Sequence, residues 1–316
     1  MEDHSPVRVA IIQAASALFD RGASLHKAET LIQEAGSGGA QLLLFPEAFI
    51  PCYPRGLTFG MKVGSRSPEG RALWQRYWQN SVEIPSSTTD ALGEAAAAAG
   101  VHVAIGVTER DSSYGGGTLY CTLLYLGPDG QVLGKHRKLK PTGAERLIWG
   151  EGDGSTLTTL DTELGTIGGL ICWENYMPLA RAAMYAKGVE IYLAPTADAR
   201  DTWQATLRHI ACEGRCFVLG CNQFLTKDMY PDDLPLRREL REQAEVICRG
   251  GSAVVSPFGQ VLAGPLYGEE GILYADLDRD ELIRSKVDFD VVGHYARPDI
   301  FELRVDERPR PPIKTT

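Results

Sequence analysis

Apolar runs short enough to be buried strands alternate with helical patterns along nearly the whole chain of 316 residues. Residues 7–14 and 41–45, for example, are strand-like and flank residues 24–35, where apolar side chains recur at helical spacing. Turns rich in proline and glycine at residues 128–130 and 257–260 join other strands directly, so part of the sheet must be antiparallel. The pattern therefore predicts an α/β fold with a mixed sheet.

The other predicted strands cover residues 101–107, 119–126, 131–140, 164–171, 190–194, 217–222, 251–256 and 261–263. The other predicted helices cover residues 89–99, 178–187 and 202–215. No low-complexity linker divides the sequence and no repeat of solenoid length is present. We therefore expect one domain over residues 1–316, with a proline-rich tail from about residue 305.

One strand-like run stops at a thiol. Gly168-Gly169-Leu170-Ile171 is followed by Cys172 and then by the polar run Trp173-Glu174-Asn175. This order is typical of a buried strand that delivers a nucleophile to a strand-to-helix bend, where the next backbone N–H can face a developing anion. By itself a cysteine at such a place is more often an inert, buried packing residue.

Two further strands end in charged residues. Residues 41–45 run into Pro46, which cannot continue a central strand and leaves Glu47 at the strand end. Residues 131–142 pass through a basic cluster that contains Lys135, Lys138 and Lys140 and stops at a proline. Because ligands gather at strand ends in sheets flanked by helices, the glutamate, a lysine and the cysteine predict one site. Strand alternation places Lys138 and Lys140 on the same face and does not distinguish them.

A thiol, a carboxylate and a cation suit hydrolysis at an unsaturated carbon. A thiolate needs a base to take its proton, and a partly buried glutamate with a raised pKa can do this near neutrality. Attack places negative charge on a nitrogen or oxygen, which a lysine and a backbone N–H can stabilise.

Four stretches of the chain resemble the nitrilase branch of the carbon–nitrogen hydrolase superfamily. They are Phe45-Pro46-Glu47-Ala48-Phe49-Ile50-Pro51, His136-Arg137-Lys138-Leu139-Lys140-Pro141-Thr142, Ile171-Cys172-Trp173-Glu174-Asn175-Tyr176-Met177-Pro178 and Val292-Gly293-His294-Tyr295-Ala296-Arg297-Pro298-Asp299. The resemblance extends from Val9 to about Phe301. It implies a four-layer α-β-β-α sandwich, no cofactor and no metal, and a homodimer or higher homo-oligomer.

The same resemblance assigns roles to individual residues. It implies that Cys172 is the nucleophile, Glu47 the general base and Lys138 the stabilising cation, the lysine being chosen by the Arg-Lys dipeptide of the family pattern. The family carries a second glutamate shortly after the lysine, and Glu145 matches it. The alternative for Glu145 is a surface partner of Arg146.

The implied reaction is hydrolysis of a small organic nitrile by water to the carboxylic acid and ammonia. Trp173, Asn175 and Met177-Pro178 resemble the nitrile-cleaving branch more than the amide-cleaving ones, so an amidase or carbamoylase is the alternative. Trp173 and Tyr53 are expected to contact the substrate. A scaffold protein of this fold without activity, or a thiol redox protein, is disfavoured because Glu47, Lys138 and Cys172 are all present and Cys172 has no resolving cysteine nearby.

Composition agrees with such an enzyme. The net charge of −9 argues against nucleic acid as a partner, because phosphate binding requires a basic face. The polar N-terminus resembles no secretory signal, and no apolar stretch could span a membrane, so we expect a cytoplasmic location. His209, Cys212 and Cys216 would share a helix face, but no fourth ligand stands at a usual zinc spacing, so we expect them to pack in the core.

Some segments leave two interpretations open. Residues 51–83 are aromatic and could line the substrate site and contact another subunit, or simply add a helix over residues 68–79. Residues 226–245 are rich in charge and proline, which predicts a solvated or mobile loop, with a partner surface as the alternative. His294 and Tyr295 are expected to serve packing or subunit contact, and residues 305–316 to form an extended or flexible arm.

Overall fold

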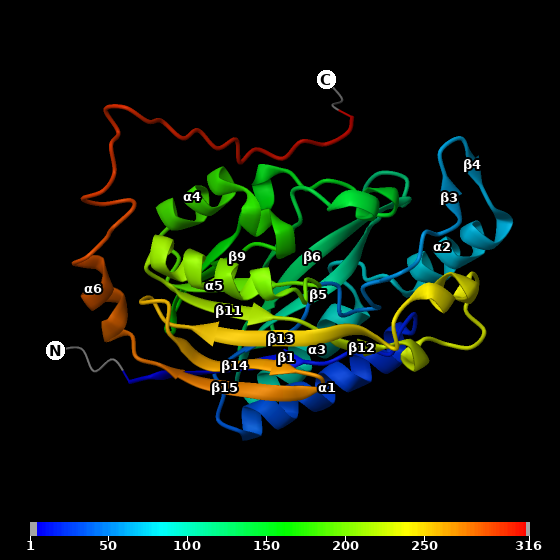
Figure 1. The fold of residues 1–316 in the computed structure, drawn as a ribbon, viewed down its shortest axis with the longest axis horizontal. Helices are drawn as coiled ribbons and strands as arrows, with labels where there is room; N and C mark the ends of the chain where they lie inside the picture. Colours follow the sequence, from blue (N-terminus) through cyan, green and yellow to red (C-terminus); the bar gives the residue numbers. More distant parts are fainter. Residues whose placement is uncertain (1–4, 314–316) are drawn as a thin grey trace.

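The computed structural model describes residues 5–313 and contains two mixed sheets that face each other (Figure 1). The first sheet contains, in spatial order, β15 (Gly271–Leu277), β1 (Val7–Gln13), β2 (Leu42–Leu44), β5 (His102–Asp111), β6 (Thr118–Leu126) and β7 (Val132–Arg137). The second contains β12 (Phe224–Thr226), β13 (Val246–Val255), β11 (Phe217–Cys221), β10 (Ile191–Pro195), β9 (Gly165–Gly169) and β8 (Thr159–Thr162), with β14 (Val261–Tyr267) paired to β13. In each sheet three neighbouring strands are parallel and antiparallel strands flank them, as the alternation predicts.

Helices cover the outer face of each sheet. Figure 1 shows α1 (Arg21–Ser37) on the opposite side of the sheets from α4 (Pro178–Ala186) and α5 (Asp201–Gly214). The helix α3 (Ser87–Ala99) packs beside α1 and ends where Gly100 takes a φ of 66°, a left-handed conformation that glycine adopts without steric cost.

Three buried apolar clusters occupy the spaces between these layers. One joins α1 and α3 to the first sheet, for example through Ile32 and Leu92. The central cluster joins the two sheets, where Ile11 of β1 and Leu219 of β11 both take part. The third lies between the second sheet and α4 and α5 and includes Leu207. This is the α-β-β-α sandwich that the resemblance implies.

The aromatic segment of residues 51–83 contains the expected extra helix and also reaches the candidate site, while its contact with another subunit stays a prediction. The helix α2 (Pro68–Asn80) begins after Ser67, whose hydroxyl oxygen accepts a hydrogen bond from Gly70 N–H, and is preceded by the short hairpin of β3 (Met61–Lys62) and β4 (Ser65–Arg66). Tyr77 of α2 is fully buried in the central cluster. The start of the same segment, around Tyr53, reaches the candidate site described below.

The prediction of a solvated or mobile loop at residues 226–245 misses a buried part of this segment. The segment forms two short 3₁₀ helices, η4 (Lys227–Met229) and η5 (Arg237–Glu242), and buries Tyr230, Leu234, Leu236 and Leu240 in the central cluster. Asp233 of this segment pairs with Arg76 of α2 at 3.0 Å, and Glu239 accepts the N–H of Thr58 at 2.7 Å. The irregular spacing of the four apolar residues matches neither helix nor strand periodicity, which explains why composition alone was misleading.

The C-terminal segment is extended and lies against its own chain. The helix α6 (Asp280–Lys286) precedes it, and Figure 1 shows the chain then passing over α4. Glu307 pairs with Lys187 at 2.8 Å, and the N–H of Arg310 donates to Asp153 at 2.6 Å. Tyr295 packs on Phe289 and remains 58% exposed, so its expected role in subunit contact stays a prediction. Residues 314–316 of the expected arm lie outside the described residues.

No helix in the described range 5–313 has the length and apolar character needed to cross a membrane.

Candidate active site

Glu47 stands just beyond the end of β2, in a turn that a glycine makes possible. The following residue, Ala48, has a φ of 48°, and the chain then passes close to Gly106 of β5. A Cβ at Gly106 would lie 2.2 Å from the carbonyl oxygen of Pro46 and 2.4 Å from the backbone nitrogen of Ala48. Only glycine therefore allows β5 to support the turn that presents Glu47.

Cys172 occupies the predicted strand-to-helix bend. It follows β9 and begins the short 3₁₀ helix η3 (Cys172–Tyr176), with a φ of 74° that is uncommon for any residue but glycine. Asn175 holds the bend, because its side-chain amide donates to the carbonyl oxygens of Leu170 and Cys172 at 2.9 Å each. The sulfur is thus held at the end of the strand, toward the side chains of neighbouring strand ends.

Lys138 connects the two glutamates of the site. Its Nζ lies 2.6 Å from Oε1 of Glu47 and 2.8 Å from Oε2 of Glu145, and the lysine side chain is completely buried. Lys135 instead pairs with Glu109 at 2.6 Å, and Lys140 pairs with Glu151 at the surface. Because β7 ends at Arg137, the alternation that left Lys138 and Lys140 equivalent does not apply to either.

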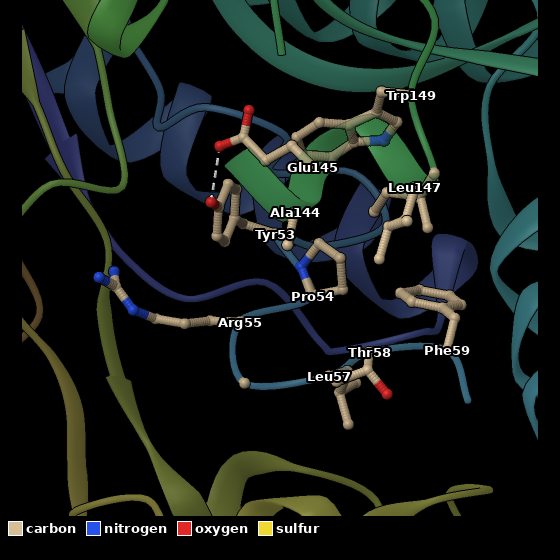
Figure 2. A pocket seen from close by; sticks show the side chains of 12 residues that line it. Tyr53, Pro54, Arg55, Leu57, Thr58, Phe59, Ala144, Glu145, Leu147 and Trp149 are labelled. Atoms are coloured by element: carbon tan, nitrogen blue, oxygen red, sulfur yellow. Dashed lines mark hydrogen bonds between the residues drawn. The ribbon is translucent and has the colours of Figure 1, made fainter. Parts of the chain in front are cut away.

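Glu145 faces the interior and not Arg146. It lies in the 3₁₀ helix η1 (Gly143–Leu147), accepts the backbone N–H of Thr142 at 2.6 Å and accepts the hydroxyl of Tyr53 at 2.7 Å, as Figure 2 shows. Arg146 donates to the carbonyl oxygen of Pro141. The arrangement found is therefore not the surface pair that was the alternative for Glu145.

Burial and charge together set the protonation of these groups. Burial raises the pKa of Glu47, and this outweighs the lowering by Lys138 and by the nearby Cys172 thiol. Burial also raises the pKa of the Cys172 thiol, and the charge of Glu47 raises it further. Burial would lower the pKa of Lys138, but Glu47 and the other acidic groups around it hold that pKa well above its usual value. The site thus combines a neutral thiol, a permanent cation and a carboxylate of increased basicity.

Thr196 is a site residue that sequence reasoning missed. It directly follows β10, the strand next to β9, and its hydroxyl donates to Sγ of Cys172 at 3.1 Å. The parallel pairing of β9 and β10 brings both strand ends to the same edge of the sheet. The sequence predicts a strand over residues 190–194, and its end could have been included in the site, but no reactive side chain stands there to indicate this.

The buried carboxylate of Glu174 connects the end of β7, next to Lys138, with the bend at Cys172. Oε1 of Glu174 accepts the N–H of Leu139 at 2.6 Å, and its Oε2 accepts the N–H of Ile171 at 2.7 Å and lies 3.0 Å from Nε2 of His136. Nδ1 of His136 lies 2.8 Å from the carbonyl oxygen of Thr156. Since both partners accept, the histidine donates from both nitrogens and is an imidazolium. Burial lowers the pKa of His136, but the charge of Glu174 outweighs this and raises it.

A cavity of about 170 Å³ opens onto Cys172. Tyr53 and Trp173, the two residues expected to contact substrate, both line it, together with Thr142, Glu145, Ala197, Asp198, Arg55 and Arg200. Nε1 of Trp173 donates to Asp198 at 2.8 Å, and the guanidinium of Arg200 stacks over the indole at 4.7 Å. The indole is therefore fixed as one wall.

A second cavity of about 150 Å³ adjoins the first, because Tyr53, Arg55 and Glu145 line both. Figure 2 shows its apolar side, which includes Leu147, Phe59 and Trp149.

No metal arrangement is present among residues 5–313, where no group of three or more His, Cys, Asp or Glu side chains is placed to hold an ion. The expected core packing is confirmed for Cys216, which lies in the third apolar cluster, whereas Cys212 is only partly buried. It is wrong for His209, whose side chain is largely exposed and pairs with Glu213 at 3.5 Å.

Comparison with known proteins identifies close relatives. The family model described as carbon-nitrogen hydrolase matches residues 8–286. The chain is 54% identical over 308 residues to an aliphatic nitrilase of Sinorhizobium fredii, covering 98% of each protein. It is 50% identical over 314 residues to the bifunctional nitrilase/nitrile hydratase NIT4A of Lupinus angustifolius, covering 98% of this chain and 89% of the other. The crystal structure of Nit3 from Saccharomyces cerevisiae, a member of branch 10 of the nitrilase superfamily, shares the fold, with a TM-score of 0.69 at 21% identity and coverage of 92% of this chain and 97% of that one.

Proposed function

This chain belongs to the nitrilase branch of the carbon–nitrogen hydrolase family, and from that premise we propose that it is an enzyme that hydrolyses an organic nitrile to the carboxylic acid and ammonia. The observation that carries the proposal is the contact of one buried lysine, Lys138, with two carboxylates next to a thiol at a strained bend. The near-full-length relatives named nitrilase favour a nitrile over the amide of the alternative amidase or carbamoylase reaction.

In the first step Cys172 adds to the nitrile carbon. The thiol proton passes to Glu47, a carbon–sulfur bond forms, and one bond of the nitrile triple bond opens onto nitrogen. Lys138 and the backbone N–H of Trp173, near the start of η3, stabilise the negative charge on that nitrogen. Glu47 then returns the proton to nitrogen, which gives a neutral thioimidate.

In the later steps two water molecules are consumed. Glu47 takes a proton from the first water as its oxygen adds to the thioimidate carbon, and the nitrogen leaves as ammonia after it is protonated, which leaves a thioester. A second water adds to the thioester in the same way, the carbon–sulfur bond breaks, and Cys172 recovers its proton. Glu145 holds Lys138 and the hydroxyl of Tyr53 in place throughout. The sum is one nitrile and two waters converted to one acid and one ammonia.

A panel of aliphatic and aryl nitriles with their corresponding amides tests this proposal, with ammonia and acid both measured. We expect release from at least one nitrile, slower or no release from the corresponding amide, and complete loss in Cys172→Ala. Cys172→Ser should also be nearly inactive, because a hydroxyl has a far higher pKa than a thiol and Glu47 is too weak a base to compensate. Turnover of amides alone would favour the amidase, and substantial activity in Cys172→Ala would rule out the covalent route.

Three wider expectations belong to the same proposal. We infer one domain over residues 1–316, which the central cluster shared by the two sheets supports. We also infer a homodimer or larger homo-oligomer, in line with the exposed apolar side chains of the C-terminal segment. A cytoplasmic location suits an enzyme whose nucleophile must stay a free thiol.

A further inference from the structure

We propose that Arg55 forms an anion-binding subsite in the cavity of Cys172, so that the preferred substrates are short nitriles that carry a carboxylate. The inference rests on the proposed nitrile hydrolysis and adds to it the charge of the substrate. Its basis is a cation that lines the reactive cavity and has no acidic partner.

Arg55 differs in this respect from the other arginine of the cavity. The guanidinium of Arg200 donates from two nitrogens to Asp198, at 2.8 and 2.5 Å, so the charges of that pair cancel. Arg55 forms no ion pair with any residue between 5 and 313, and its side-chain partners there are the neutral carbonyl of Ala197, which accepts from Nη1, and the thiol of Cys248. None of these partners is an acid, so the charge of the guanidinium is left to bind an anionic ligand.

The position of Arg55 is fixed by its surroundings. The hydroxyl of Tyr230 donates to the carbonyl oxygen of Arg55 at 2.7 Å, and the N–H of Arg55 donates to the carbonyl of Tyr53 at 2.8 Å. In Figure 2 its guanidinium points away from the apolar side chains of Leu147 and Phe59. A half-buried guanidinium without a counter-ion is unfavourable unless a ligand supplies the charge, and its planar fork fits a carboxylate.

The charges of the site also dictate how such a substrate lies. Glu47 and Glu145 stand at the reacting end and would repel a second anion there. A nitrile with a carboxylate at its far end therefore directs the nitrile to Cys172 and the carboxylate to Arg55. Because the cavity measures about 170 Å³, only a short chain fits between the two ends.

The test compares three nitriles of equal length that differ in charge: 3-cyanopropanoate, butanenitrile and protonated 3-aminopropanenitrile. For the wild type we expect the highest kcat/KM with the anion and the lowest with the cation. Arg55→Gln should lower the ratio of kcat/KM for anion over neutral nitrile by about 10- to 100-fold, the usual range for losing a charged hydrogen bond. Arg55→Lys should retain part of that ratio because it keeps the charge but loses the fork.

Arg71→Gln is the matched control, because it removes the same charge from α2, where Arg71 lines a separate cavity. It should leave the anion-to-neutral ratio unchanged. Should Arg55→Gln not fold, inhibition of wild-type butanenitrile turnover by pentanoate decides, because pentanoate has the length of 3-cyanopropanoate and one carboxylate only: competitive inhibition supports the subsite, and none overturns it. A ratio that Arg55→Gln does not change also overturns it. Failure of the wild type to hydrolyse any nitrile would instead reject the proposed function itself.

Discussion

The two oxygens of Glu47 have unequal surroundings. Oε1 lies 2.6 Å from Nζ of Lys138, whereas Oε2 is buried and accepts no hydrogen bond from the described residues. An unpaired acceptor in a buried site is unfavourable, so Oε2 is the oxygen that we expect to take the proton of Cys172. The contact with Lys138 meanwhile orients the carboxylate before substrate arrives, and this division of roles can be tested one residue at a time.

The lysine assignment is the first prediction at this scale. Lys138→Met keeps the apolar stem and removes the cation, and Glu47→Gln keeps the shape and removes the base, so each should lower kcat at least about 100-fold. Lys140→Met is the matched control, because Lys140 pairs with Glu151 at the surface, and it should retain most of the wild-type rate. Steady-state kinetics on one nitrile measures all three. Loss of activity in Lys140→Met with a near-normal rate in Lys138→Met would reverse the assignment.

The pH profile gives a second test of the base. Burial raises the pKa of Glu47, and the charge of Glu145 raises it further. A base is lost as the pH falls through its pKa, so kcat/KM should decline on the acid side at a midpoint above 4.5, the ordinary value for glutamate. In Glu145→Gln one negative charge is gone, so the residual activity should show a lower midpoint. A midpoint that rises in the variant would contradict this interpretation.

At the scale of single elements, the site was predictable where the signal was local. A strand that ends at a proline before Glu47, and one that ends at Cys172, are visible in a few consecutive residues. Thr196 and Arg55 were not visible, because their roles arise from the pairing of β10 with β9 and from the packing of residues 226–245 over the aromatic segment. Such contacts join residues far apart in sequence, and no local pattern records them.

The link between β7 and the bend of η3 leads to a prediction about stability. Glu174 and His136 form a fully buried pair at 3.0 Å, so Glu174→Gln should lower the free energy of unfolding by roughly 3 to 5 kcal/mol, as expected when one partner of a buried ion pair is removed. Glu163→Gln is the control, because Glu163 contacts His102 at the same distance but is 67% exposed, and it should cost less than about 1 kcal/mol.

Chemical denaturation measures the free energy of unfolding of both variants, and the contribution of the His136–Glu174 pair should depend on pH in a definite direction. The pKa of His136 is raised in the folded state, so the stabilisation by the pair is complete below the ordinary histidine value of 6.5 and is lost as the pH rises through the raised pKa. Equal effects of the two substitutions would show that the buried pair is not a structural link.

For the molecule as a whole, the layers were easier to predict than their order. Alternating strands and helices predict an α/β fold, but the sequence of strands across each sheet depends on distant pairings such as that of β15 with β1. In that pairing Val7 lies opposite Leu277, and β15 becomes the edge strand of the first sheet. Residues 271–277 carry no pattern strong enough to predict a strand, so their place became apparent only from the pairing.

The exposed face of α6 leads to the last prediction, which concerns assembly. Ile283 of α6 and Val287, the residue that directly follows α6, are four residues apart and 69% and 80% exposed, so they form an apolar surface that a second copy of the chain could cover. Val287→Asp should therefore reduce the size of the particle in sedimentation velocity while leaving the fold, measured by circular dichroism, intact. Val132→Asp, at the start of β7 and 41% exposed, introduces the same charge on another surface and should leave the particle size unchanged. If Val287→Asp sediments like the wild type, the subunit contact lies elsewhere. If both variants dissociate, added negative charge rather than the surface at α6 controls assembly, because the net charge of the chain is already −9 and further charge increases repulsion between copies.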